Sequence, residues 1–185
     1  MTHAEIARMV LSMEILIDTR EQDTERFRRR IKAFECPVKR ATLDFGDYTY
    51  NATFPDGTQL VDLSGRVVPK CSIERKMDLD ELAQCFTHGR ERFTAEFERA
   101  MAHGADFWLL VENGNYDGVL RGMYRSHIQP SAFLGSILAF TMRYNAHVVF
   151  CSEFSTARII RDILRMDLRE RLEKGEFMIA SGSGP

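Results

Sequence analysis

Short runs of consecutive apolar residues alternate along the chain with longer segments in which apolar residues recur every three or four positions. The runs are typical of buried strands, and the three-to-four spacing is typical of amphipathic helices. Strands are predicted over residues 14–18, 38–43, 48–54, 59–63, 71–74, 107–112 and 148–151, and helices over 24–36, 78–86, 90–103, 130–144 and 155–168. Because strands alternate with helices, we expect an α/β sandwich around a mixed sheet.

Turn and boundary signals refine this picture. Residues 55–58, Pro-Asp-Gly-Thr, predict a hairpin that joins the strands before and after them. After the Asn-Gly-Asn turn that begins at Asn113, the residues up to Gln129 give no clear pattern. We expect an N-terminal extension over 1–13 with a flexible start, one domain over 14–176 and a disordered tail over 177–185.

The composition is that of a globular protein. A length of 185 residues and an apolar content of 44% suit one domain with a substantial core. No stretch of 18 residues lacks charge, which excludes a membrane span, and residues 1–13 contain no apolar signal core. The cysteines at 36, 71, 85 and 151 have no metal-ligand spacing and are expected to be free thiols. We therefore expect an intracellular location: the cytoplasm or nucleoid of a prokaryotic or virus-infected cell, or a nucleus.

Two acidic residues and a lysine stand at the ends of predicted strands. Asp47 lies in the Gly-Asp turn before one strand, and Glu74 and Lys76 lie at the end of another. Because strand side chains alternate between faces, Glu74 and Lys76 project to the same side. Two carboxylates can hold a divalent metal, and a neighbouring ammonium can stabilise a phosphate. The arrangement indicates metal-assisted hydrolysis of a phosphodiester.

A bland interpretation competes with this one. The chain is 28% charged, so a Glu-Arg-Lys triplet by itself is compatible with an ordinary solvated strand end. The net charge of −2 gives no indication of nucleic-acid binding. The basic clusters at 26–32, 90–92 and 158–169 are most simply interpreted as solvated helix faces. The neighbouring elements favour a site, because an apolar run delivers Asp18 and an amphipathic helix begins near Asp80.

These residues resemble the signature of the XPF/Mus81/Hef family of structure-specific DNA endonucleases, in which Gly-Asp is followed by a spacer, Glu-Arg-Lys, three residues and Asp. Here the pattern is Gly46-Asp47, the spacer 48–73, Glu74-Arg75-Lys76 and Asp80. The resemblance covers residues 14–166 and includes Asp18-Thr19-Arg20-Glu21 and Gly89-Arg90. It implies a restriction-endonuclease-like fold, a three-layer sandwich whose central mixed sheet is flanked by helices, and dependence on a metal.

The resemblance also implies roles for the central residues. Asp47 and Glu74, together with the backbone carbonyl of Arg75, are expected to hold Mg²⁺ or Mn²⁺. Lys76 is expected to orient the nucleophile or to stabilise developing negative charge.

The remaining matches leave alternatives open. Asp18 and Glu21 either hold a second metal or position Arg20, whose planar guanidinium suits a phosphate. Asp80 is either a catalytic acid or an ordinary acid of the first helical turn. Arg90 is expected to contact DNA because it matches the family's Gly-Arg.

DNA is the expected partner, with no membrane and no small-molecule cofactor. Many relatives carry a tandem helix-hairpin-helix module, for which the roughly fifteen residues after the last predicted helix leave no room. We therefore expect either a stand-alone nuclease domain or an excised one. The resemblance implies branched or flap-type DNA as the substrate. The alternative is a non-catalytic DNA-binding or scaffold subunit, although such pseudo-nucleases lose the acids and lysine that this chain retains.

A homodimer through the C-terminal half is also expected. The 130–144 helix has one apolar face of Phe133, Ile137, Phe140 and Tyr144, and further apolar residues at Leu134, Leu138 and Ala139 on adjoining sides. A helix that is apolar over much of its circumference is usually buried on two sides, within one chain or against a partner. Resemblance to the family favours the partner.

Overall fold

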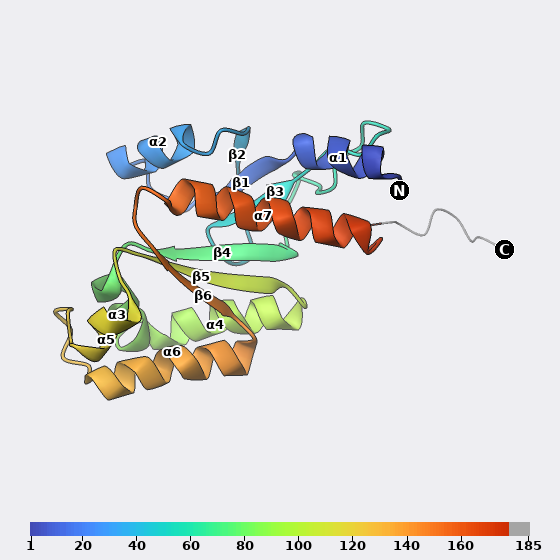
Figure 1. Ribbon diagram of the computed structural model, residues 1–185. Coiled ribbons are helices and arrows are strands. Elements are labelled where there is room, and N and C mark those ends of the chain that lie inside the picture. The colour runs from blue at the N-terminus through green and yellow to red at the C-terminus, as the bar shows by residue number, and fades with distance from the viewer. Residues whose placement is uncertain (178–185) are drawn as a thin grey trace.

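A computed structural model describes residues 1–177 of the chain. Its centre is a six-stranded mixed sheet in the order β2-β1-β3-β4-β5-β6 (Figure 1). The strands are β1 (Glu14–Asp18), β2 (Val38–Ala41), β3 (Tyr48–Asn51), β4 (Cys71–Lys76), β5 (Asp106–Glu112) and β6 (His147–Cys151). Strand β3 runs antiparallel to both β1 and β4, whereas the β1–β2, β4–β5 and β5–β6 pairs are parallel.

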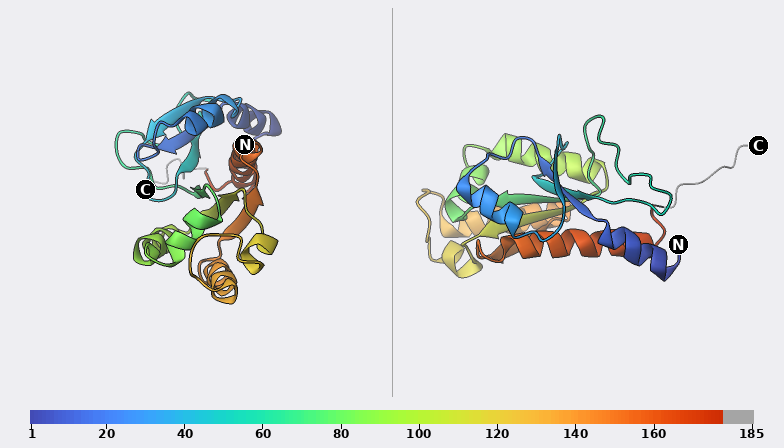
Figure 2. Two further views of the ribbon diagram at one scale, coloured as in Figure 1. Left: turned by 90° about the vertical axis from the view of Figure 1, so that its left-hand side faces the viewer. Right: turned by 90° about the horizontal axis from the view of Figure 1, so that it is seen from above.

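Helices cover both faces of this sheet. They are α1 (His3–Leu11), α2 (Glu25–Lys32), α3 (Leu79–Phe86), α4 (Arg90–Ala102), α5 (Tyr116–Leu120), α6 (Pro130–Tyr144) and α7 (Thr156–Glu173). Helices α1, α2 and α7 lie on one side, and α3, α4, α5 and α6 lie on the other (Figures 1 and 2). The expected three-layer α/β sandwich is confirmed.

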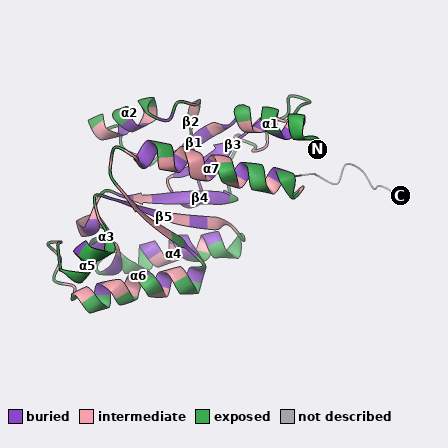
Figure 3. Ribbon diagram, in the orientation of Figure 1, coloured by how far each residue is buried: buried purple, intermediate pink, exposed green. Residues whose placement is uncertain are grey.

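The alternation of strand side chains gives each face its own hydrophobic core. On β5, Leu110 joins the cluster beneath α1, α2 and α7, whereas Leu109 and Val111 join the cluster beneath α3, α4 and α6. All three side chains are buried, and the buried residues concentrate in the central strands and on the inner sides of the helices (Figure 3). On β4 the same alternation sends Ile73 toward α7, so Glu74 and Lys76 face the α3–α4 layer.

Two segments differ from the sequence expectations. Strand β3 ends at Asn51, and a single bridge, Thr53 to Gln59, stands where a hairpin of full strands was predicted. The buried Asn51 explains the difference, because its side-chain oxygen accepts the backbone N–H groups of Ala52 and Val61. A side chain that captures these donors competes with a strand ladder. The second difference is α5, which lies within the segment that sequence left unassigned.

The first thirteen residues are more ordered than expected. Residues 3–11 form α1, which begins with a capping box between Thr2 and Glu5. Ile6 and Met9 are buried in the core cluster that α7 also lines. The predicted flexible start is therefore wrong: the motif-based reasoning stopped at Glu14 and overlooked an amphipathic helix.

The other general expectations concern cysteines, membranes and the tail. All four cysteines are free. Among the described residues, no helix combines the length and apolar character that crossing a membrane requires. Of the predicted tail, Phe177 packs partly against the core, and residues 178–185 lie outside the described part of the chain.

Candidate active site

A tight turn before β3 places Asp47 against the centre of the sheet. Gly46 has a φ of 72°, a left-handed conformation that favours glycine. The backbone N–H of Asp47 donates to the carbonyl of Ile73 at 2.8 Å, and its carbonyl accepts from the N–H of Asp18 at 2.9 Å. Its carboxylate Oδ2 accepts the backbone N–H of Arg75 at 2.8 Å. These bonds fix Asp47 beside the carboxyl end of β4.

Glu74 and Lys76 project from β4 as the strand alternation predicts. Lys76 Nζ lies 2.5 Å from Glu74 Oε1, and the ammonium lies 5.4 Å from the centre of the Phe93 ring. Both side chains are buried. Burial opposes the charged ammonium, but the carboxylates of Glu74 and Asp47 outweigh it and raise the pKa of Lys76. Lys76 therefore stays cationic and is a donor and a positive charge rather than a base.

The pKa of Asp47 reveals an excess of negative charge at this site. Burial raises it well above the ordinary range, and the nearby carboxylates of Glu74 and Glu21 raise it further. Lys76 and the N–H of Arg75 oppose the shift without overcoming it. Crowded carboxylates with this shortage of positive charge are a suitable environment for a cation.

The donor set was tested for its fit to a divalent metal. Within residues 1–177, no three His, Cys, Asp or Glu side chains stand close enough to hold an ion by themselves. Mg²⁺, however, commonly binds through one or two carboxylates and keeps several waters. The carboxylates of Asp47 and Glu74, with the backbone carbonyl of Arg75 between Glu74 and Lys76, fit a metal of that kind.

The side chain of Arg75 points to the opposite face of the sheet. Its guanidinium lies 3.4 Å from Glu112 and 4.0 Å from Glu21, and its Nε is buried without a hydrogen-bond partner in the described chain. Burial opposes its charge, but Tyr48, Glu21 and Glu112 keep the pKa raised. The guanidinium of Arg75 thus belongs to an ion-pair network on the opposite face of the sheet. Only the backbone of Arg75 faces Asp47 and Glu74.

The residues after β1 form a second part of the site. Asp18 accepts hydrogen bonds from the backbone N–H and Nε of Arg20, at 2.6 and 2.7 Å, and from Leu43 N at 3.0 Å. Glu21 accepts from the hydroxyl of Tyr48 at 2.9 Å. Both carboxylates therefore already accept hydrogen bonds from the protein. This favours the interpretation in which they position Arg20, rather than the one in which they bind a second metal. The side chain of Arg20 is 51% exposed, as a phosphate contact requires.

Asp80, the last acid of the signature, makes its hydrogen bonds to Arg125 and not to Asp47 or Glu74. Asp80 Oδ1 accepts the backbone N–H of Arg125 at 2.5 Å, and Oδ2 accepts Arg125 Nε at 2.8 Å. The bond from the Arg125 backbone is the main reason that the pKa of Asp80 is lowered. The helix cap itself is Asp78, whose side chain accepts from Glu81 N. Asp80 thus anchors the loop that carries Arg125.

Arg90 is the first residue of α4 and follows the N-cap Gly89. It is exposed and makes no hydrogen bond or ion pair with any residue in the described range. That exposure leaves it available to an external anion.

Glu96 is a site residue that the sequence analysis missed. It lies on the buried face of α4 between Phe93, Phe97 and Ala100, and its Oε1 is 4.0 Å from Arg20 and 3.9 Å from Arg99. Burial, together with the charge of Glu74 and a hydrogen bond to it, raises the pKa of Glu96 to about 7. The sequence feature that could have identified Glu96 is its position within an apolar helical stripe. Burying a carboxylate there is costly, so its presence suggests a function.

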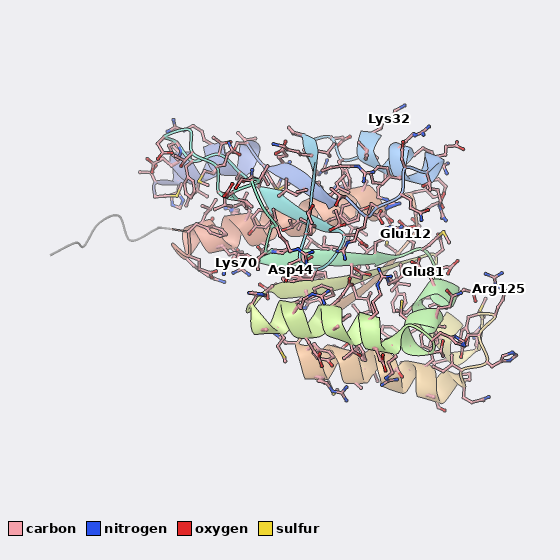
Figure 4. All side chains as sticks on the ribbon, turned by 180° about the vertical axis from the view of Figure 1, so that it is seen from behind. Lys32, Asp44, Lys70, Glu81, Glu112 and Arg125 are labelled. Atoms are coloured by element: carbon pink, nitrogen blue, oxygen red, sulfur yellow. The ribbon has the colours of Figure 1, made fainter. Side chains whose placement is uncertain are left out.

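A cavity of about 1350 Å³ opens beside these groups. Glu74, Lys76 and Glu96 line its inner end, and α3, the start of α4 and residues 125–128 form its walls. Figure 4 shows Glu81 and Arg125 at the same end of the molecule as Glu112. The candidate site is therefore reachable from a large hollow and lies at the carboxyl ends of β4 and β5.

Comparisons with known proteins agree with this geometry. A family model, the ERCC4 domain, matches residues 17–162. The chain is similar to the solved structure of XPF from Aeropyrum pernix, with a TM-score of 0.60 and 19% identity over 93% of this chain and 67% of that one. It is also similar to XPF from Aeropyrum pernix in complex with DNA, with a TM-score of 0.59 and 18% identity over 93% and 75%. No curated protein matches. The chain belongs to the ERCC4-domain family of DNA nucleases and has its restriction-endonuclease-like fold.

Proposed function

We propose that the protein is a Mg²⁺- or Mn²⁺-dependent endodeoxyribonuclease that hydrolyses phosphodiester bonds in branched or flap-type DNA. The observation that carries this proposal is the group of Asp47, Glu74 and Lys76 at the end of β4, in which the buried Glu74 and Lys76 are in contact and the half-buried Asp47 supplies a second carboxylate. Membership of the ERCC4-domain family supports a nuclease, and a related structure holds DNA.

The residues divide the work of hydrolysis. Asp47, Glu74 and the Arg75 carbonyl would hold the metal, which when bound would supply polarisation of a phosphate and acidification of a water. Lys76, in contact with Glu74, is the cation of this group. It stabilises the negative charge that develops on the phosphate oxygens. Arg20, aligned by its bonds to Asp18, contacts a phosphate of the same strand.

A non-catalytic DNA-binding subunit is the second candidate. Such a protein has no need to bury an acidic pair and a lysine, which is costly unless the geometry is favourable. Here Glu74 and Lys76 are buried together in contact, which favours catalysis over the scaffold role.

The test is cleavage of single-stranded, duplex, flap and branched DNA in Mg²⁺, in Mn²⁺ and in excess chelator. Asp47→Asn and Glu74→Gln should lose activity by at least roughly a thousand-fold while still binding DNA, because each removes a metal ligand. Asp56→Asn, an exposed acid in the 55–58 turn, is the matched control and should cut like the wild type. Turnover in chelator, or near-normal cleavage by either site variant, would reject the mechanism.

We also propose that the protein acts as a homodimer through its C-terminal half. Phe133, Ile137 and Phe140 of α6 are covered within the chain, but Leu138 and Met142 on its outer side are exposed. The outer edge of β6 is unpaired within the described sheet. An exposed apolar stripe on a helix and an unpaired strand edge are both typical association surfaces.

A further inference from the structure

The cavity beside the candidate active site has walls that none of the proposed catalytic steps uses. Its lining includes Thr87 and Arg92 from one side and Arg125 and Ile128 from the other, and the inner end reaches Lys76. A phosphate held near Lys76 therefore has neighbouring nucleotides that must either enter this hollow or leave in the opposite direction.

Two arginines, one from α4 and one from the 125–128 segment, line the cavity with guanidinium nitrogens that no described residue accepts. Arg92 is exposed, and its side chain makes no hydrogen bond or ion pair within residues 1–177. Arg125 uses its backbone N–H and Nε on Asp80, and its two terminal nitrogens bond to no residue in that range. Its side chain is 87% exposed, so these nitrogens are open to a ligand (Figure 4). Guanidinium groups of this kind suit phosphate oxygens.

The lining also carries acids, of which Glu74 pairs with Lys76, and none of them pairs with the side chain of Arg92 among the described residues. Asp80 is already paired with Arg125, and Glu81 accepts the backbone N–H of Met77 at 2.6 Å. The remaining surface includes the apolar side chains of Phe93 and Ile128. A ligand that matches the cavity therefore carries both anionic groups and a flat, largely apolar body, which is the chemistry of a nucleotide.

The volume indicates how many nucleotides fit. Pockets for drug-sized ligands measure roughly 300–1,000 Å³, and this cavity is larger, at about 1350 Å³. It is bounded by α3 and α4 on one side and by residues 125–128 on the other. This volume suits a short stretch of unpaired strand.

We propose that the cavity is a subsite for one or two unpaired nucleotides that adjoin the scissile phosphate. Arg92 and Arg125 contact the phosphates of this strand. Asp80, the last acid of the family signature, is a positioning residue that acts through Arg125 and holds the 125–128 wall in place. The inference rests on the proposed nuclease function and deepens it by naming the part of the substrate that this cavity recognises.

The first experiment measures binding in an Asp47→Asn background, so that cleavage does not interfere. Flap DNA carrying 2-aminopurine in the unpaired strand next to the junction, and a fully paired duplex of equal length, are titrated at several salt concentrations. Arg92→Ala and Arg125→Ala should each weaken flap binding about five-fold and lower the salt slope by about 0.7, the value for one lost contact to a single strand. Duplex binding should change less than two-fold.

The matched control is Arg121→Ala, which removes an exposed arginine of the same connection that does not line the cavity. It should bind flap DNA with the affinity of the parent. The fluorescence of 2-aminopurine should change on binding as it does with the parent. The subsite is overturned if Arg92→Ala and Arg125→Ala bind flap DNA like the parent, or if they weaken duplex binding equally.

The second experiment tests the role of Asp80 in the catalytically competent chain. Asp80→Ala should raise KM for flap DNA as Arg125→Ala does, and the double variant should be no worse than either single one. Additive losses, or a fall in kcat for Asp80→Ala that Arg125→Ala does not share, would show that Asp80 acts on the chemistry directly. Circular dichroism of each variant shows whether the fold is retained.

The outcomes separate the two proposals. If the wild type cuts no DNA with either metal and the Asp47→Asn chain binds none, the nuclease function itself fails. If the wild type cuts flap DNA while the cavity variants match it in binding and KM, only the subsite fails.

Discussion

Charged side chains in the candidate site lie where a fold optimised for stability alone would place apolar ones. Glu74 and Lys76 are both buried, and their mutual attraction must offset the loss of water around two charges. The half-buried Asp47 adds a further carboxylate to the same place. Such arrangements persist where a charged ligand completes them, which is the physical reason that perturbed pKa values mark functional sites.

Glu96 gives this argument a measurable consequence. Its pKa of about 7 in the folded protein exceeds the unfolded value, so the native state binds more protons between these values. This contribution to stability is complete below about pH 4.3, the ordinary value for a glutamate, and is lost as pH rises through 7. In chelator, the wild type should therefore lose up to about 3 kcal/mol of unfolding free energy between pH 4.5 and 8 from this group.

Urea denaturation at several pH values measures the effect. Glu96→Gln should remove this part of the pH dependence and be more stable than the wild type at pH 8, because it buries no charge. Glu98→Gln, on the same helix but exposed, should keep the wild-type profile. A Glu96→Gln variant with unchanged pH dependence would contradict the assignment.

Sequence reasoning found some of these residues and not others for physical reasons. Strand alternation predicted that Glu74 and Lys76 share a face, whereas Asp47, separated from Glu74 by residues 48–73, was assigned from its position in a strand-end turn and its match to the family signature. Glu96 was missed because only the packing of α4 on the sheet shows which neighbour it meets. The contact between Asp80 and Arg125 spans 45 residues, and no local pattern encodes it.

At the scale of elements, the Gly46 turn is what delivers Asp47 to β4. A Cβ at Gly46 would lie 2.0 Å from Ser72 Oγ and 3.3 Å from the Ile73 carbonyl, in addition to the strain of a positive φ. Gly57 has a similar φ of 88° but no atom within 4 Å of such a Cβ. The two glycines therefore separate backbone strain from collision.

Gly57→Ala should cost about 1–2 kcal/mol of unfolding free energy, the usual penalty for a left-handed alanine. Gly46→Ala should cost at least twice as much and also impair DNA cleavage, because the displaced turn carries Asp47. Urea denaturation and cleavage rates measure both effects. Equal costs for the two variants, or full activity of Gly46→Ala, would show that the turn accommodates a side chain.

The elements themselves were predicted where one periodicity dominates. The apolar runs of β1, β5 and β6 and the helical spacing of α6 were predicted nearly to their ends, whereas the last helix was predicted to end at residue 168 and α7 continues to Glu173. The 59–63 strand was wrong because a buried side chain, Asn51, captures the backbone that a ladder would use. Local pattern cannot reveal such a tertiary hydrogen bond.

For the molecule as a whole, the sheet separates two cores with different tasks. The α1–α2–α7 side covers the network around Arg75, and the α3–α4–α6 side carries the cavity and the aromatic cluster beneath it. The ring centres of Phe86, Phe93 and Phe140 lie within 6 Å of one another in that cluster. This packing fixes the wall that Lys76 faces.

The outer side of α6 supplies the last prediction, which concerns assembly. Leu138 and Met142, four residues apart on one face, are 40% and 81% exposed. Light scattering at micromolar concentration should give twice the mass of one chain. Leu138→Glu with Met142→Glu should yield a folded monomer, because two charges would be buried in the interface. Leu11→Glu, equally exposed on α1, should remain dimeric. A wild type that is monomeric and still cuts DNA would show that the chemistry needs no second copy.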